Sequence, residues 1–79
     1  MTDDAICSFD SPESSSVAGA SYNFETEVLT VRLRRKDEGE VVYRYGNVPL
    51  NIWQEFDAAP SKGVYFSRFI RPMFGGKPV

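Results

Sequence analysis

The sequence predicts an α+β fold in the order βββαα, in which a three-stranded antiparallel meander carries two C-terminal helices on one face. Three runs before residue 46 alternate apolar and polar residues, and two later runs repeat apolar residues at helical spacing. The strand runs are joined by segments too short for a parallel crossover. Seventy-nine residues make one small domain, and the 14% of aromatic residues must supply most of its core. We therefore expect a two-layer sandwich.

The three strand runs are "VAGASYNF" (17–24), "VLTVRLRR" (28–35) and "VVYRY" (41–45). Successive strand residues point to opposite faces of a sheet, so each run divides into two sets. The face toward the helices is expected to carry Ala18, Ala20, Tyr22, Phe24, Leu29, Val31, Leu33, Val41, Tyr43 and Tyr45. The outer face is expected to carry Arg32, Arg34 and Arg44.

Two amphipathic helices follow. Pro49 suits a first helical turn, and Ile52, Trp53 and Phe56 continue from it at helical spacing. Pro60 ends this helix, because the residue before a proline avoids the helical conformation. Ser61 is the predicted N-cap of the second helix, "KGVYFSRFIR". Its apolar stripe comprises Tyr65, Phe66, Phe69, Ile70 and Met73.

The two ends of the chain and its cysteine content predict the domain organisation and the cellular compartment. Residues 1–13 are expected to form a flexible acidic leader, and residues 14–79 a single domain. Cys7 is the only cysteine, so no internal disulfide can form, which favours a reducing cytoplasm. The N-terminus lacks the apolar segment of a signal peptide, and no run is long enough to cross a membrane.

Charge is distributed unevenly along the chain. Residues 1–28 carry six acids and no base, whereas residues 29–79 carry nine bases and five acids. After Asp57 there are four bases and no acid. The asymmetry suggests an anionic partner, although charged residues also coat small domains that bind no anion.

Four motifs occur in order along the chain: "SSSVAGASY", "LTVRL", "VYRYGNVP" and "APSKGVYFSRFI". Together they resemble the KTSC domain, a short bacterial and phage module named after the C-terminus of certain lysyl-tRNA synthetases. The resemblance covers about residues 14–74. The matching positions are Ser14, Ser15, Tyr22, Tyr43, Tyr45, Val48, Pro49, Ala59, Ser61, Gly63, Tyr65, Phe66 and Ile70. It implies RNA binding, and it implies no catalytic activity.

The central "YRY" has two interpretations. Tyr43 and Tyr45 can stack nucleic-acid bases, or they can belong to the core while Arg44 faces water. Strand alternation favours the core. The start of the second helix, Ser61 to Gly63, has two interpretations as well. It can bind a phosphate with help from Lys62, or Ser61 only caps the helix while Gly63 allows close packing.

The outer arginines can follow a nucleic-acid backbone or can simply coat a solvated sheet. Catalysis and metal binding are not expected, because the chain has no histidine and no cysteine cluster. The sequence thus predicts a non-enzymatic module without a cofactor that binds RNA. The alternative is a protein-interaction module, such as a small phage or mobile-element protein that docks on a host protein. The candidate nucleic-acid-binding residues are Arg32, Arg34, Tyr43, Arg44, Tyr45, Ser61, Lys62, Gly63, Arg68 and Arg71.

Overall fold

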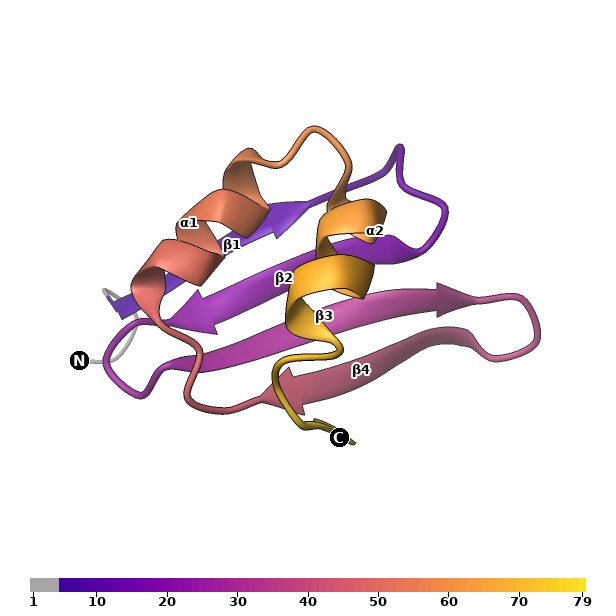
Figure 1. The fold of residues 1–79 in the computed structure, drawn as a ribbon. Coiled ribbons are helices and arrows are strands. Elements are labelled where there is room, and N and C mark those ends of the chain that lie inside the picture. The colour runs from indigo at the N-terminus through magenta and orange to yellow at the C-terminus, as the bar shows by residue number, and fades with distance from the viewer. Residues whose placement is uncertain (1–4) are drawn as a thin grey trace.

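The computed structural model describes residues 5–79 and contains one antiparallel sheet with helices on one side of it (Figure 1). The strands follow the chain across the sheet in the order β1-β2-β3-β4-β5. Their bounds are β1 Ile6–Asp10, β2 Val17–Asn23, β3 Val28–Arg35, β4 Gly39–Tyr45 and β5 Gly76–Pro78. The helical elements are α1 Leu50–Ala58, α2 Lys62–Tyr65 and η2 Phe66–Ile70, the last of which is a π-helical turn.

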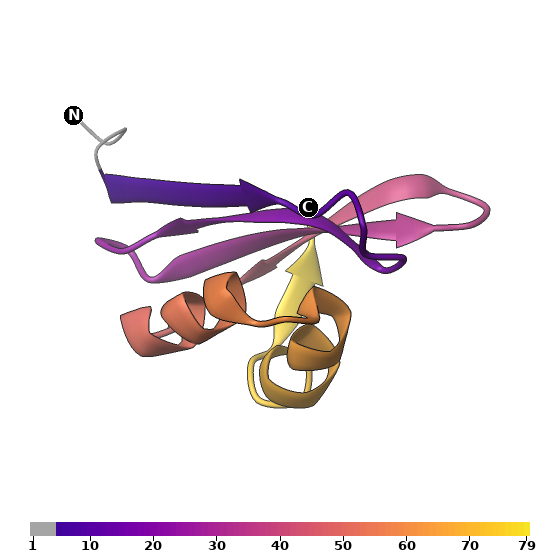
Figure 2. The ribbon, with the colours of Figure 1, turned by 90° about the horizontal axis from the view of Figure 1, so that it is seen from above.

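The two layers are clear when the domain is seen from above (Figure 2). The sheet forms one layer, and α1, α2 and η2 together form the other. The predicted α+β architecture, with an antiparallel sheet and helices on one face, is therefore confirmed. The predicted number of three strands is wrong, because β1 and β5 extend the meander by one strand at each edge.

The first added strand lies inside the segment predicted to be a flexible leader. β1 pairs with β2 along its whole length, from Ile6 opposite Asn23 to Asp10 opposite Gly19. Phe9 packs against the core cluster on the helical side. The leader prediction is therefore wrong for residues 6–10, and its residues 1–4 lie outside the described part of the chain.

The second added strand follows the helices. β5 pairs with the end of β4, where Tyr43 lies opposite Pro78 and Tyr45 opposite Gly76. An added Cβ at Gly76 would come within 2.2 Å of the Tyr45 ring, so only glycine lets this strand pass so close to it.

The core lies between the central strands and α1. Trp53 and Phe56 are buried, and the Trp53 ring stacks on those of Tyr22 and Phe9, with centroids 5.6 and 5.4 Å apart. The Tyr22 hydroxyl donates a 2.5 Å hydrogen bond to the carbonyl of Val48, which ties the start of α1 to β2. The prediction that the α1 stripe packs on the apolar sheet face is confirmed.

Several predicted core residues lie elsewhere. Phe24 is 44% exposed in the β2–β3 turn, and Phe69 and Met73 are 45% and 65% exposed. The second helix widens into a π turn in which the Arg71 N–H bonds to the carbonyl of Phe66. This wider turn breaks the 3.6-residue repeat on which the predicted stripe depended, and only Phe66 and Ile70 are buried there.

The remaining structural tests concern membranes and metals. None of the helices within residues 5–79 combines the length and the apolar character that a transmembrane span needs. The same residues contain no group of three or more carboxylate or thiol side chains placed to hold a metal ion.

Candidate nucleic-acid interface

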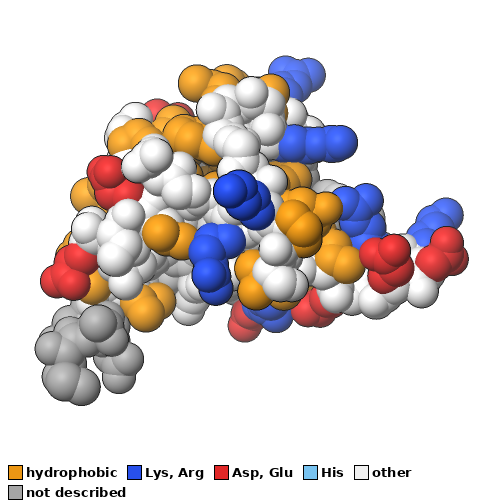
Figure 3. Space-filling view, turned by 90° about the horizontal axis from the view of Figure 1, so that it is seen from below, with side chains coloured by type: hydrophobic (Ala, Val, Ile, Leu, Met, Phe, Trp, Pro, Cys, Tyr) orange, Lys and Arg blue, Asp and Glu red, His pale blue; other side chains and the backbone are white. Residues whose placement is uncertain are grey.

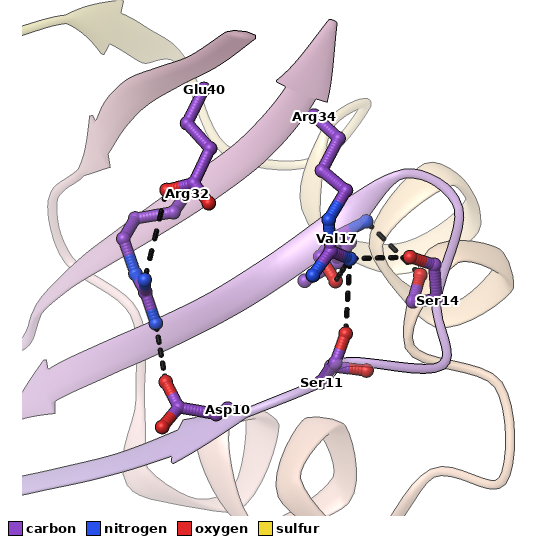
Figure 4. Close-up of polar contacts among 7 residues, drawn as sticks. All are labelled: Asp10, Ser11, Ser14, Val17, Arg32, Arg34 and Glu40. Atoms are coloured by element: carbon purple, nitrogen blue, oxygen red, sulfur yellow. Dashed lines mark hydrogen bonds and ion pairs between the residues drawn. The ribbon is translucent and has the colours of Figure 1, made fainter.

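The outer sheet face does carry the predicted arginines, but the fold already uses two of them. Arg32 reaches across Gly19 to Asp10 of β1, with a 2.5 Å contact, and lies 3.7 Å from a carboxylate oxygen of Glu40 (Figure 4). A Cβ at Gly19 would come within 2.1 Å of the Arg32 guanidinium. The Arg32 charge is therefore balanced by two acids.

Arg34 has a structural role that the sequence did not reveal. Its Nη1 donates hydrogen bonds to the carbonyl oxygens of Ser11 at 3.0 Å, Val17 at 3.2 Å and Ser14 (Figure 4). These bonds hold the loop between β1 and β2 against the sheet. The Ser14 hydroxyl in turn accepts the N–H of Val17 at 3.0 Å. The expected arginine face does not form, and of its three members Arg44 alone is exposed rather than half-buried.

The start of the second helix also has internal partners. The Ser61 hydroxyl accepts the N–H of Val64 at 3.3 Å, which confirms the predicted cap. Lys62 donates to the carbonyls of Asp57 and Ala59 and lies 5.1 Å from the centre of the Phe9 ring. Its ammonium thus closes the end of α1, so the structure does not bring it to the predicted anion site.

Gly63 allows the close packing that was the alternative to phosphate binding. A Cβ at this position would come within 2.4 Å of the Ser16 hydroxyl. The loop before β2 and the start of α2 therefore meet here, and they bring the first and last of the four sequence motifs together. Arg68 lies beside them, on the rim of a hollow that contains the serines of both segments.

The two central tyrosines have different environments. Tyr45 is 3% exposed and its ring contacts Phe66 edge-on, so it belongs to the core as alternation predicted. Tyr43 is only half-buried and stacks on Tyr45 with ring centroids 6.5 Å apart. Burial raises the pKa of the Tyr45 phenol and Tyr43 adds to that rise, whereas the charges of Arg71 and Arg35 oppose it.

Tyr43, Tyr45, Arg35 and Arg71 surround one hollow of about 290 Å³, which we call the tyrosine hollow. It forms because the far end of the β3–β4 hairpin extends beyond α2, leaving part of the helix-facing side of the sheet uncovered (Figure 1). Arg35 follows Leu33 on that side by strand alternation. The full lining is Leu33, Arg35, Tyr43, Tyr45, Phe66, Arg71, Phe74, Gly75 and Gly76.

A second hollow, of about 570 Å³, lies next to the first at Gly75 and holds Arg44 and Lys77, which are opposite each other in the β4–β5 register. We call the four cations of the two hollows, Arg35, Arg44, Arg71 and Lys77, the basic edge. Neither lining contains an Asp or Glu of the described residues. Figure 3 shows this side of the molecule, where Lys and Arg lie over the centre, the right and the upper right, while acids lie toward the left, at the right-hand tip and along the lower edge.

The basic edge includes two predicted residues, Arg44 and Arg71, and two that sequence reasoning missed. Arg35 was only the last residue of the predicted strand run 28–35, and Lys77 was only one of the four bases after Asp57. The absence of acids after Asp57 was a usable signal for Lys77. For Arg35 the signal was its even spacing from Leu29, Val31 and Leu33, which places it on the helix-facing side.

The fold and its edges define a small α+β domain built on one five-stranded antiparallel sheet. A model of the KTSC domain matches residues 13–74, and the chain belongs to the KTSC domain family. The KTSC domain protein YPO2434 from Yersinia pestis has a similar structure, with a TM-score of 0.79 and 27% identity over 95% of this chain and 99% of that one.

Lysine–tRNA ligases are similar to the chain over 63 residues, which is 80% of its length. The ligase of Trichormus variabilis is 43% identical and that of Nostoc sp. is 41% identical. The chain spans about 10% of the length of these curated relatives.

Proposed function

We propose that this domain binds RNA through the basic edge and performs no catalysis. The observation that carries the proposal is a pair of hollows that share Gly75 and contain no acid in their described linings. One holds Arg35, Arg71 and the half-buried Tyr43, and the other holds Arg44 and Lys77. Phosphate backbones are bound by such groups of Lys and Arg, and base rings stack on exposed aromatic side chains. The similarity to lysine–tRNA ligases, whose name specifies a tRNA substrate, supports the same proposal.

None of the four cations of the basic edge forms an ion pair within residues 5–79, where the ion pairs belong to Arg32. An anionic backbone can therefore bind these cations without the loss of free energy that breaking an internal ion pair would involve. This holds although the whole chain has a net charge of −2, because the acids lie mostly in the N-terminal part and at the β3–β4 turn.

A protein-interaction module is the second candidate, and a specific observation favours it. Val64, Phe69 and Met73 are 51%, 45% and 65% exposed on the α2–η2 segment and the turn after it. Exposed apolar side chains that are close together are typical of protein-binding surfaces. This surface and the basic edge involve different residues, so variants can separate the two functions.

The proposal is tested by fluorescence anisotropy with a labelled RNA in about 50 mM and about 200 mM salt. The double variant Arg44→Gln/Lys77→Gln should bind more weakly, and its plot of log affinity against log salt should be less steep by about 0.7 for each phosphate that the variant no longer binds. Both side chains are exposed, so thermal melting should be unchanged.

The double variant Lys36→Gln/Arg68→Gln is the matched control, because it removes the same charge from exposed positions outside the basic edge. An equal loss in this control would show that binding depends on overall charge alone. If the unmodified domain binds no RNA even in low salt, the RNA proposal is rejected and the apolar surface becomes the next candidate.

A further inference from the structure

We propose that the tyrosine hollow receives one unpaired nucleotide, with its base against the ring of Tyr43 and its phosphate between Arg35 and Arg71. The inference rests on the proposed RNA-binding function and makes it more specific, because it requires a single-stranded segment in the ligand. It is argued from the shape of the hollow, the support of Tyr43 and the charges on the rim.

The shape of the tyrosine hollow prevents a double-stranded RNA helix from reaching the residues at its base. The lining residues come from β3, β4, η2, the segment after it and the start of β5, so the space of about 290 Å³ is bordered on several sides. A duplex presents a convex phosphate surface and keeps its base rings stacked inside. A single nucleotide that has left the stack can place its base in such a recess.

Tyr43 is held as a platform at this recess. Its ring stacks on that of Tyr45, with 29° between the ring planes, and Tyr45 is fixed in turn by Phe66 and by the passage of Gly76 over its ring. A platform that is already ordered loses little conformational entropy when a base binds to it.

The tyrosine hydroxyls at the hollow are also available. Tyr22 and Tyr65 use their hydroxyls inside the fold, as donors to Val48 and Glu55. Within residues 5–79 neither the Tyr43 nor the Tyr45 hydroxyl makes a hydrogen bond of this kind, and Tyr43 is the more exposed of the two side chains. These hydroxyls can donate to a base edge or a phosphate oxygen.

The two arginines at the tyrosine hollow favour the binding of an anion there. Arg35 at the end of β3 and Arg71 after η2 come from different elements, yet both line the hollow and both act on the same Tyr45 phenol. Two guanidinium groups that line one hollow repel each other, and the described lining of this hollow has no carboxylate; Asp37 and Glu38 line a neighbouring hollow with Arg35. A phosphate between the two guanidinium groups would remove this repulsion and accept hydrogen bonds from both.

The test compares a single-stranded oligouridylate of about 12 nucleotides with a blunt RNA duplex of the same length, by fluorescence anisotropy in low salt. The unmodified domain should bind the single strand roughly tenfold or more tightly than the duplex. Tyr43→Leu should weaken binding of the single strand by roughly tenfold and leave duplex binding unchanged, because it removes the stacking ring and keeps apolar bulk. Phe24→Leu is the matched control, since Phe24 is exposed and lines neither hollow.

Equal affinity for the two RNAs, or full single-strand binding by Tyr43→Leu, would overturn the inference and leave the RNA-binding proposal in place. Absence of binding to both RNAs would reject both. If Tyr43→Leu does not fold, Arg71→Gln gives the answer, because Arg71 is exposed. That variant should reduce the salt slope for the single strand by about 0.7, and an unchanged single-strand slope would contradict the inference.

Discussion

Replacing Trp53 by alanine is expected to remove a large part of the free energy of unfolding of the domain. The side chain is 4% exposed and stacks between Tyr22 and Phe9, with Phe56 edge-on at 6.4 Å. Removing a buried aromatic ring costs about 3–5 kcal/mol of unfolding free energy, and a small domain has only about 5–15 kcal/mol in total. Part of the loss comes from the aromatic pairs, each worth about 0.5–1.5 kcal/mol beyond its buried area.

Thermal and urea unfolding followed by circular dichroism measure this loss. Leu50→Ala is the control on the same helix, because Leu50 is 45% exposed and its truncation should change the free energy of unfolding by less than about 0.5 kcal/mol. A Trp53→Ala domain that melts cooperatively near the wild-type temperature would contradict the two-layer core.

Arg34→Ala is expected to have the second-largest effect, of about 3 kcal/mol. The substitution leaves the carbonyls of Ser11, Ser14 and Val17 without their charged donor in a partly buried site. Hydrogen bonds to charged groups contribute about 1.5–3 kcal/mol each, and one nitrogen with two hydrogens cannot satisfy three acceptors fully. The loop between β1 and β2 should loosen first, since Arg34 ties it to β3.

Arg32→Ala is the matched control, from the same strand and the same face. Its side chain is 40% exposed, and exposed ion pairs contribute no more than about 1 kcal/mol. Equal destabilisation by the two variants in urea unfolding would show that Arg34 acts only as a surface charge. Faster amide exchange in the loop of Arg34→Ala than of Arg32→Ala is the expected result.

The central strands and α1 could be predicted because their patterns are unambiguous. Leu29, Val31 and Leu33 alternate without interruption, and Trp53 and Phe56 continue a helical stripe that begins at a proline. The edge strands could not be predicted in this way. β1 buries little of its surface, and β5 contains glycine and proline, which are depleted in strands.

The candidate site was only partly predictable, for a related reason. Residue type was enough to identify Tyr43, Arg44 and Arg71. Whether a given arginine is available to a ligand or is bonded inside the fold depends on tertiary contacts, which the sequence does not show. Arg34 and Arg44 have the same strand environment in the sequence, yet Arg34 is engaged by a loop some twenty residues away. The π turn likewise gives no signal in the sequence, and it decides that Phe69 is exposed.

The central claim is that RNA binds at the basic edge, and amide chemical-shift mapping tests it most directly. A single-stranded oligouridylate is titrated into the ¹⁵N-labelled domain in low salt, and the shifts are assigned residue by residue. The account predicts the largest changes in β4, in β5 and around Arg35 and Arg71, with little change in α1. Changes confined to Val64, Phe69 and Met73, or no change at saturating RNA, would contradict it.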